Sequence, residues 1–399
     1  MMDMGRIIVL FVLLFLVTSE FFSTSIVYGD NLPTENLWSQ KKPMEQERGH
    51  VGVAVVDGKI YVIGGNYAIG TEWNAVGTNE QYDPLLDKWF FKATMPVASD
   101  DFAIAVWNEK IYCFSPTLNQ EYDPKSDTWT NKTAMPTARW SLQANTIGDT
   151  IYLVGGQTPG TYTTYTDISL ALNEAYDPAT DTWTTMASMP YATRAYASAV
   201  FNDKLYVFGG LQLNDLQIES LTQIYNPETN SWHLGSSSPI ITSYAKAVTT
   251  TGVSAPPKIY LFDAGALHLP SAQAYDPVTD TWATGVAQPT SRMSFGTAVV
   301  DDLIYAIGGH SFNMTMYPTS TISYTSFSLN EQYTPFGYGL LDTKNQTKQP
   351  SLTYSPTPYL PLDRNAPHLD LIFYLIPIAV IFVAIAVSIL ICRRHRKTD

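Results

Sequence analysis

One pattern of apolar and polar positions recurs along the middle of the chain. A short apolar run that ends in glycine or polar residues is followed by a turn, a Tyr-Asp-Pro, a Trp and, in three copies, a Met-Pro. The first copy reads KIYVIGG and then NEQYDPLLDKWFFKATMP, and related copies begin at positions 110, 150, 204, 258 and 303. Short apolar runs bounded by Gly, Pro and Asp are typical of β-strands, and a recurrence of this length indicates a repeat fold.

The aromatic residues of the copies keep a common register. One Tyr follows Ile or Leu in each apolar run, at Tyr61, Tyr112, Tyr152, Tyr206, Tyr260 and Tyr305. A second Tyr stands just before the Pro, at Tyr82, Tyr122, Tyr176, Tyr225, Tyr275 and Tyr333. Seven residues after five of these stands a Trp: Trp89, Trp129, Trp183, Trp232 and Trp282. No Trp follows Tyr333, whereas an unmatched Trp38 lies near the front of the chain. The counts predict five complete units and a sixth that takes its last strand from the N-terminal segment, which closes a ring without exposed edges.

These motifs resemble the kelch repeat, and the resemblance covers roughly residues 36 to 338. It implies an all-β, six-bladed kelch-type β-propeller, closed by an N-terminal strand that completes the last blade. The glycines Gly64, Gly65, Gly155, Gly156, Gly209, Gly210, Gly308 and Gly309 and the six Trp residues, Trp38 included, are then structural. The second and fifth units depart from the double glycine, with Ser115-Pro116 and Asp263-Ala264. The resemblance also implies that Arg48, Arg139 and Arg292 pack between blades.

The two ends of the chain are predicted to be targeting and membrane-anchoring segments rather than parts of the propeller. Residues 1–29 contain a basic residue and an apolar run from Arg6 to Val17, the layout of a secretory signal peptide, with an uncleaved anchor as the alternative. After a propeller at 30–338, residues 339–370 are rich in Pro, Thr and Ser, which predicts an extended stalk. Residues 371–391 carry no charge, which predicts one C-terminal transmembrane helix, and the basic tail 392–399 favours a cytoplasmic C-terminus. We therefore expect a single-pass cell-membrane protein with its propeller outside.

Charge and cysteine content narrow the classes of partner. The formal net charge is −13, so the surface repels nucleic-acid phosphates and we expect no nucleic acid as partner. Cys113 and Cys392 fall on opposite sides of the expected membrane, which argues against a disulfide between them. The sequence carries no prediction of oligomeric state.

Candidate binding residues lie where a propeller gathers its loops. The residues that start the inner strands align by register as His50, Asp101, Ser141, Arg194 and Ser294. The loops after the second strands add Asn66, Gln157, His268 and His310. The loop from His310 to Asn330 is the longest, and its Thr, Ser, Tyr and Asn content suits an adaptable binding surface, with a plain solvated loop as the alternative.

Catalytic chemistry finds little support in the sequence. The histidines stand in different units without the short spacing of a metal site, so we predict no metal and no cofactor, and assign no catalytic residue. Three Asn-x-Thr sequons, at Asn131, Asn313 and Asn345, are candidate glycosylation sites in a chain that faces outside. The first hypothesis is a surface-anchored module that binds a protein or a glycan. The alternatives are an extracytoplasmic, mutarotase-like sugar-converting enzyme and a structural component of the cell envelope.

Overall fold

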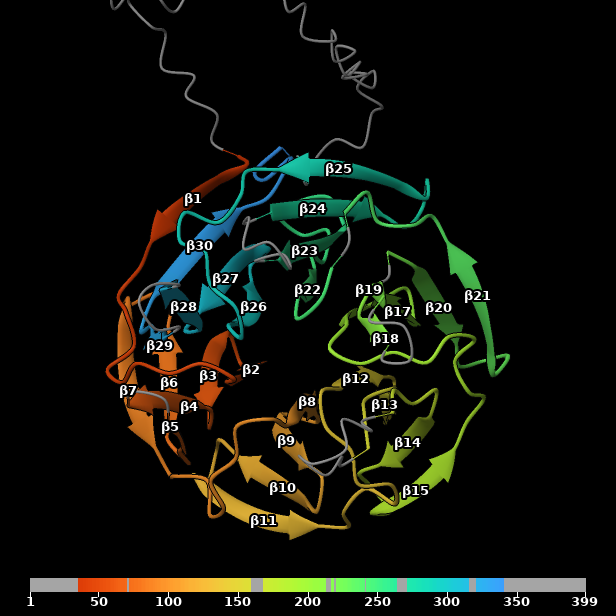
Figure 1. Ribbon diagram of the computed structural model, residues 1–399, viewed down its shortest axis with the longest axis horizontal. Coiled ribbons are helices and arrows are strands. Elements are labelled where there is room, and N and C mark those ends of the chain that lie inside the picture. The colour runs from red at the N-terminus through yellow and green to blue at the C-terminus, as the bar shows by residue number, and fades with distance from the viewer. Residues whose placement is uncertain are drawn as a thin grey trace, which may run out of the picture. The chain divides into compact units, whose positions relative to one another are not determined.

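The structure is a computed structural model that describes residues 35–340, except 70–71, 159–167, 213–216, 219, 241, 264–270 and 316–320. Within these residues six four-stranded antiparallel sheets form the blades of a propeller around a central axis (Figure 1). The expected signal peptide, the expected transmembrane helix and nearly all of the expected stalk lie outside the described residues. In the part that is described, no helix is long and apolar enough to span a bilayer.

Each blade runs from an inner strand at the axis to an outer strand at the rim. Blade 1 consists of β2 (Gly52–Val56), β3 (Lys59–Ile63), β6 (Asn79–Asp83) and β7 (Lys88–Lys92). Blade 2 consists of β8 (Ala103–Trp107), β9 (Lys110–Ser115), β10 (Leu118–Asp123) and β11 (Thr128–Lys132). Blade 3 consists of β12 (Gln143–Ile147), β13 (Thr150–Val154), β14 (Asn173–Asp177) and β15 (Thr182–Thr185). Blades 4 and 5 consist of β16 (Ala197–Phe201), β17 (Lys204–Phe208), β20 (Thr222–Asn226) and β21 (Ser231–Gly235); and β22 (Lys246–Thr249), β23 (Ile259–Asp263), β24 (Ser271–Asp276) and β25 (Thr281–Gly285).

Blade 6 joins the two ends of the propeller, as the aromatic count predicts. It consists of β26 (Gly296–Val300), β27 (Leu303–Ile307), β30 (Asn330–Thr334) and β1 (Leu37–Gln40). β1 pairs antiparallel with β30, and Trp38 lies opposite Tyr333, as Trp89 lies opposite Tyr82 in blade 1. The inner strands contact one another in the order β2, β8, β12, β16, β22, β26 and back to β2. The ring is therefore closed by the N-terminal strand.

The repeated Trp residues join each blade to the one before it. Every indole Nε1–H donates to a backbone carbonyl of the preceding blade or of the segment that follows it, at 2.8 to 3.1 Å. Trp38, for example, donates to Val286 O, which follows blade 5. Each indole also packs against the Tyr opposite it, with ring centroids 4.8 to 5.1 Å apart. These contacts fix the outer strand of each blade against the blade before it.

The three arginines are buried as the resemblance implies. Arg139 is fully buried and pairs with Glu174, while its Nη2 donates to Leu153 O at 3.0 Å. The equivalent pairs in blades 1 and 6 are Arg48 with Glu80 and Arg292 with Glu331. Blade 4 carries Thr193 and Gln223 at the same positions, where Thr193 Oγ1 donates to Gly209 O. An arginine therefore occurs together with its glutamate, which matches the high cost of burying one charge without the other.

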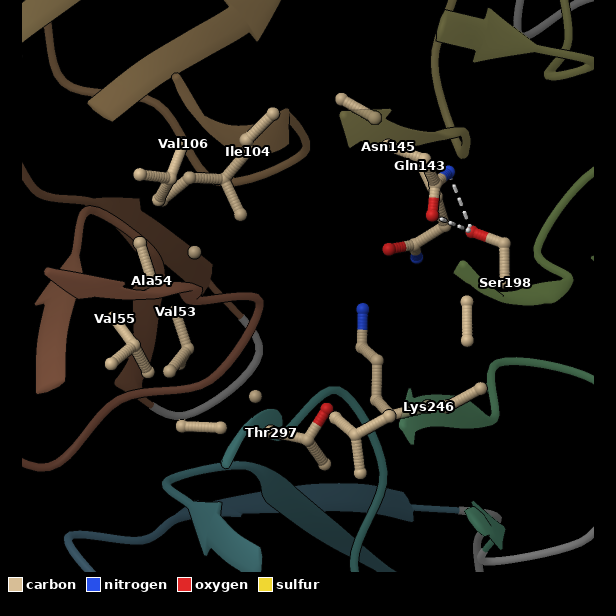
Figure 2. A pocket seen from close by; sticks show the side chains of 18 of the residues that line it. Val53, Ala54, Val55, Ile104, Val106, Gln143, Asn145, Ser198, Lys246 and Thr297 are labelled. Carbon is tan, nitrogen blue, oxygen red and sulfur yellow. Dashed lines mark hydrogen bonds between the residues drawn. The ribbon is translucent and has the colours of Figure 1, made fainter. Parts of the chain in front are cut away.

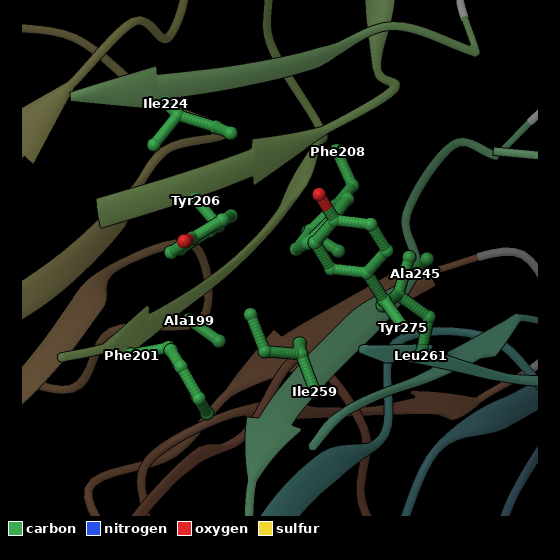
Figure 3. Close-up of a cluster of buried hydrophobic side chains, with 10 residues drawn as sticks. Ala199, Phe201, Tyr206, Phe208, Ile224, Ala245, Ile259, Leu261 and Tyr275 are labelled. Atoms are coloured by element: carbon green, nitrogen blue, oxygen red, sulfur yellow. The ribbon is translucent and has the colours of Figure 1, made fainter. Parts of the chain in front are cut away.

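Apolar contacts between neighbouring sheets make up the core. Between blades 4 and 5, Phe201, Tyr206 and Phe208 pack against Ile259, Leu261 and Tyr275 (Figure 3). The double glycines permit a close approach between blades. Gly64 has φ of 61°, and a Cβ placed on it would lie 2.6 Å from Ser99 O of the next blade.

Among the described residues, three hairpins rise from the face at which the inner strands begin. They are β4 (Asn66–Ile69) with β5 (Glu72–Ala75), β18 (Leu211–Gln212) with β19 (Gln217–Ile218), and β28 (His310–Thr315) with β29 (Thr321–Ser326). The segment 310–330, treated above as a loop, is thus largely a paired ribbon in its described part. Its Thr, Ile, Tyr and Phe residues favour extended strands, which explains the difference.

Candidate functional site

The residue two positions before each inner strand forms the mouth of a central channel. His50, Ser141, Ala195, Tyr244 and Ser294 have φ between 50° and 58°, a left-handed conformation that non-glycine residues rarely adopt. This turn lets the backbones of adjacent blades bond: His50 N donates to Ser294 O at 2.7 Å and Tyr244 N to Ala195 O at 2.6 Å. Together with Asp100 and Asp101, these residues line a cavity of about 70 Å³.

The register of one predicted residue is wrong. Ala195, and not Arg194, occupies the mouth position of blade 4, because Thr193 stands where Arg48 and Arg139 stand in their blades. Arg194 is the equivalent of Trp140, since the two form matching bridges, to Leu211 and to Gln157 respectively. The Arg194 guanidinium instead bonds to the side chain of Gln157, so these two predicted residues meet at the seam of blades 3 and 4.

Two other pairs of predicted residues meet at seams around the mouth. Ser294 Oγ lies 3.1 Å from His50 Nε2, between blades 6 and 1. Asp101 accepts hydrogen bonds from Ser141 N at 3.2 Å and from Ser141 Oγ at 3.3 Å, between blades 2 and 3. The mouth is therefore a set of polar groups whose positions are fixed by their neighbours, which suits recognition because little ordering remains to be done on binding.

A histidine that is surrounded by aromatic rings lies beside the mouth, where blades 6 and 1 meet. His310 is 1% exposed, and its Nε2 bonds to Asn66 Oδ1 at 2.8 Å, which assigns the proton to Nε2. Asn66 Nδ2 donates in turn to Asp100 Oδ2 at 2.7 Å. Burial, with a smaller contribution from His50, lowers the pKa of His310 to about 3. His310 is therefore neutral at physiological pH and acts as a fixed support.

Trp73 covers this support and presents an open aromatic surface. Its ring lies 4.7 Å from that of His310 and 4.6 Å from that of Tyr324, yet the residue is 39% exposed. The two hairpins that carry these rings are joined, since Ala68 N donates to Ser326 Oγ at 3.1 Å. A large exposed aromatic ring on a rigid support is typical of binding surfaces.

Charged residues are distributed unevenly around the mouth. Asp100 and Asp101 lie on blade 2, whereas Lys246, the first residue of β22, lies on blade 5 on the opposite side of the ring. Burial lowers the pKa of His50, and Lys246 lowers it further, while Asp101 and Asp100 act against this shift. In the described part of the chain, no group of three or more His, Cys, Asp and Glu residues could hold a metal ion.

The remaining predicted residues are one histidine and the three candidate glycosylation asparagines. His268 and Asn345 lie outside the described residues. Asn131 is exposed on the outer strand β11, and Asn313 lies in β28. Sequence reasoning also missed Trp73, Asp100, Tyr244 and Lys246. Trp73 offered a signal, because it is a Trp outside the seven-residue register of the repeat.

Comparison with known proteins agrees with the fold. The kelch motif model matches residues 47–96, 142–190 and 192–239, which contain blades 1, 3 and 4. The chain folds as a six-bladed β-propeller, and three of its blades match the kelch motif. The unmatched blades include the second and fifth, which lack the double glycine, and the sixth, which is divided between the two ends of the propeller.

The chain shares modest identity with curated kelch-like proteins. The chain is 26% identical to Kelch-like protein terF of Aspergillus terreus over 68% of its own length and 51% of that protein. It is 27% identical to human Kelch-like protein 15, over 65% of its own length and 38% of the relative, and 25% identical to mouse Kelch-like protein 36, over 74% and 41%. The chain thus spans about half or less of the length of these relatives.

Proposed function

We propose that this kelch propeller is a binding module that holds a protein partner on its channel-mouth face. The observation that carries the proposal is the exposed Trp73 ring on its His310 and Tyr324 support, beside a mouth of fixed polar groups. An aromatic anchor next to preorganised hydrogen-bonding groups is the usual composition of a binding hot spot. Kelch propellers commonly bind proteins, which favours a protein over a glycan, the other candidate for this surface.

The charge of the mouth indicates the chemistry of the partner. Asp100 is linked to the Trp73 platform through Asn66 and His310, Asp101 lines the same mouth, and the chain as a whole carries a net charge of −13. A partner segment with a Lys or Arg beside an apolar or aromatic side chain complements both features, and electrostatic attraction would speed its association. The partner therefore belongs to the class of basic, aromatic-bearing peptides or loops.

We also propose that the propeller is displayed outside a cell membrane, as an adhesion module on a C-terminal anchor. The support is the uncharged run 371–391, which is about 30 Å long as a helix, and the basic residues that follow it. Protease treatment of intact cells tests this arrangement. Loss of the propeller with retention of a C-terminal epitope tag is the expected result, and full protection of the propeller would contradict it.

Photo-crosslinking with the full-length chain tests the binding face. A photoreactive phenylalanine analogue at Ile69, which is 63% exposed on β4, should give a discrete protein adduct in intact cells. The same analogue at Phe91, which is 64% exposed on the outer strand β7, is the matched control and should not. Trp73→Ala should abolish the adduct at Ile69. The same adducts from both positions, or an adduct indifferent to Trp73→Ala, would refute the assignment of the face.

A further inference from the structure

Below the mouth, the channel widens into a chamber whose two sides differ in polarity. It has a volume of about 380 Å³ and is lined by the six inner strands. Val53, Val55, Ile104 and Val106 form an apolar wall on blades 1 and 2, while Gln143, Asn145, Ser198 and Lys246 lie on blades 3 to 5 (Figure 2). Small-molecule sites are commonly of this size, mostly apolar, with a few placed polar groups.

Lys246 is the one charged residue among those that line the chamber. Its ammonium points into the channel (Figure 2), and no hydrogen bond or ion pair joins it to another described residue. Burial lowers the pKa of Lys246, and Asp101 across the channel offsets this only in part. Lys246 is only partly buried, so its ammonium is accessible from the channel, and no partner within the fold accounts for its position.

Gln143 supplies a second donor at the same depth. It is the first residue of β12, as Lys246 is of β22, and each stands two residues after the mouth position of its blade. The side-chain amide of Gln143 has no partner among the described residues, whereas Asn145 and Ser198 satisfy each other, with Asn145 Nδ2 donating to Ser198 Oγ at 2.9 Å. One cation and one free amide therefore face the chamber together.

We propose that the chamber binds a small monocarboxylate with an apolar body. The carboxylate accepts hydrogen bonds from Lys246 Nζ and the Gln143 amide, and the body lies along the apolar wall of blades 1 and 2. A single cation balances a single negative charge, so a phosphate dianion would keep an uncompensated charge there. A sugar would leave its hydroxyl groups unpaired against the valines. Gln143 and Lys246 also line the mouth, so the carboxylate lies at the upper end of the chamber and the apolar body extends below the proposed protein-binding face.

Isothermal titration of the full-length chain with valerate tests the proposal. We expect a Kd on the order of 0.1–1 mM for a ligand of this size, with acetate and valeramide each at least about tenfold weaker. Acetate keeps the charge and lacks the apolar body, and valeramide keeps the body and lacks the charge. Butylammonium, of opposite charge, should not bind. These comparisons need no variant and so do not depend on how a mutant folds.

Lys246→Met should weaken valerate binding by about tenfold or more, because it removes a charge-assisted hydrogen bond at nearly constant side-chain length. Lys204→Met, at the start of β17 and outside the chamber, is the matched control and should leave the affinity unchanged. The proposal is overturned if valerate shows no binding, if acetate or valeramide binds as tightly as valerate, or if a folded Lys246→Met protein binds valerate as the wild type does.

Discussion

Replacing Trp38 by alanine measures how much the N-terminal strand contributes to the closed ring. Trp38 is half-buried, packs against Phe262 and Tyr333 at centroid distances of 5.3 and 5.1 Å, and donates to Val286 O at 2.9 Å. Truncating a fully buried Trp costs about 3–5 kcal/mol, so a half-buried one costs about 2 kcal/mol. The lost hydrogen bond adds about 1 kcal/mol.

The expected total is a loss of about 3 kcal/mol in the free energy of unfolding. For a domain of this size, 1 kcal/mol corresponds to roughly 2 °C in Tm, so Trp38→Ala should lower Tm by about 6 °C. Differential scanning calorimetry or thermal circular dichroism measures this directly. Trp129→Ala is the matched control, since Trp129 makes the equivalent hydrogen bond, to Ala93 O at 2.8 Å, inside a blade that is continuous in sequence.

The comparison of the two variants carries the test. If both lower Tm by similar amounts, β1 holds blade 6 as firmly as a covalently continuous outer strand holds its own blade. A Tm within about 1 °C of wild type for Trp38→Ala, beside a clear loss for Trp129→Ala, would show that the N-terminal strand does not close the ring. Such a result would refute the architecture, because β30 would then be an exposed edge.

Three further predictions concern buried charges. Arg139→Thr or Glu174→Gln alone should lower the free energy of unfolding, measured in urea, by about 3–5 kcal/mol. The double variant, which installs the Thr and Gln of blade 4, should lose less than the sum of the two single losses. Additive losses would contradict the pairing. Asp302→Asn should destabilise by about 2–3 kcal/mol at neutral pH, since the carboxylate accepts N–H bonds from residues 251 and 253–255. Burial alone raises the pKa of Asp302, but these donors lower the pKa overall. The carboxylate therefore stabilises the fold fully above its unfolded-state pKa, and this stabilisation is lost as the pH falls through its folded-state pKa. A difference in unfolding free energy between wild type and variant that does not change in the acid range would contradict this. Lys246→Met should raise Tm, because the lowered pKa of Lys246 means that the unfolded state binds the proton more tightly than the folded state does. For the same reason, the stability of the wild type should rise as the pH approaches the ordinary pKa of lysine. A lower Tm in the variant would refute this.

The fold could be predicted because its constraints repeat in the sequence. Tyr333 without a Trp, and Trp38 without a Tyr before it, stand out only against five regular units, and their pairing follows from counting. The double glycines and buried arginines are likewise fixed by contacts between neighbouring blades, so they recur at equal spacing.

The site could be predicted only in part, because it depends on the differences between units. Arg194 was placed in the mouth through a one-residue shift: Thr193 replaces the usual arginine, and the next residue happens to be an arginine. Trp73 is held by an aromatic residue from the far end of the propeller, Tyr324, and no local pattern in the sequence relates the two.

The channel is asymmetric because some of its lining positions differ between blades, whereas the strands themselves repeat. Six equivalent strands would produce a channel with equivalent walls, and the blades need only small side chains there to pack. The residues two positions after the mouth are Gly52, Ala103, Gln143, Ala197, Lys246 and Gly296. Four of these are small, as packing requires, and the two that are not lie on the same side and have unpaired donors in the described structure. Because packing requires neither the Lys246 ammonium nor the Gln143 amide, and neither pairs with another described residue, a ligand in the channel explains both better than fold stability does.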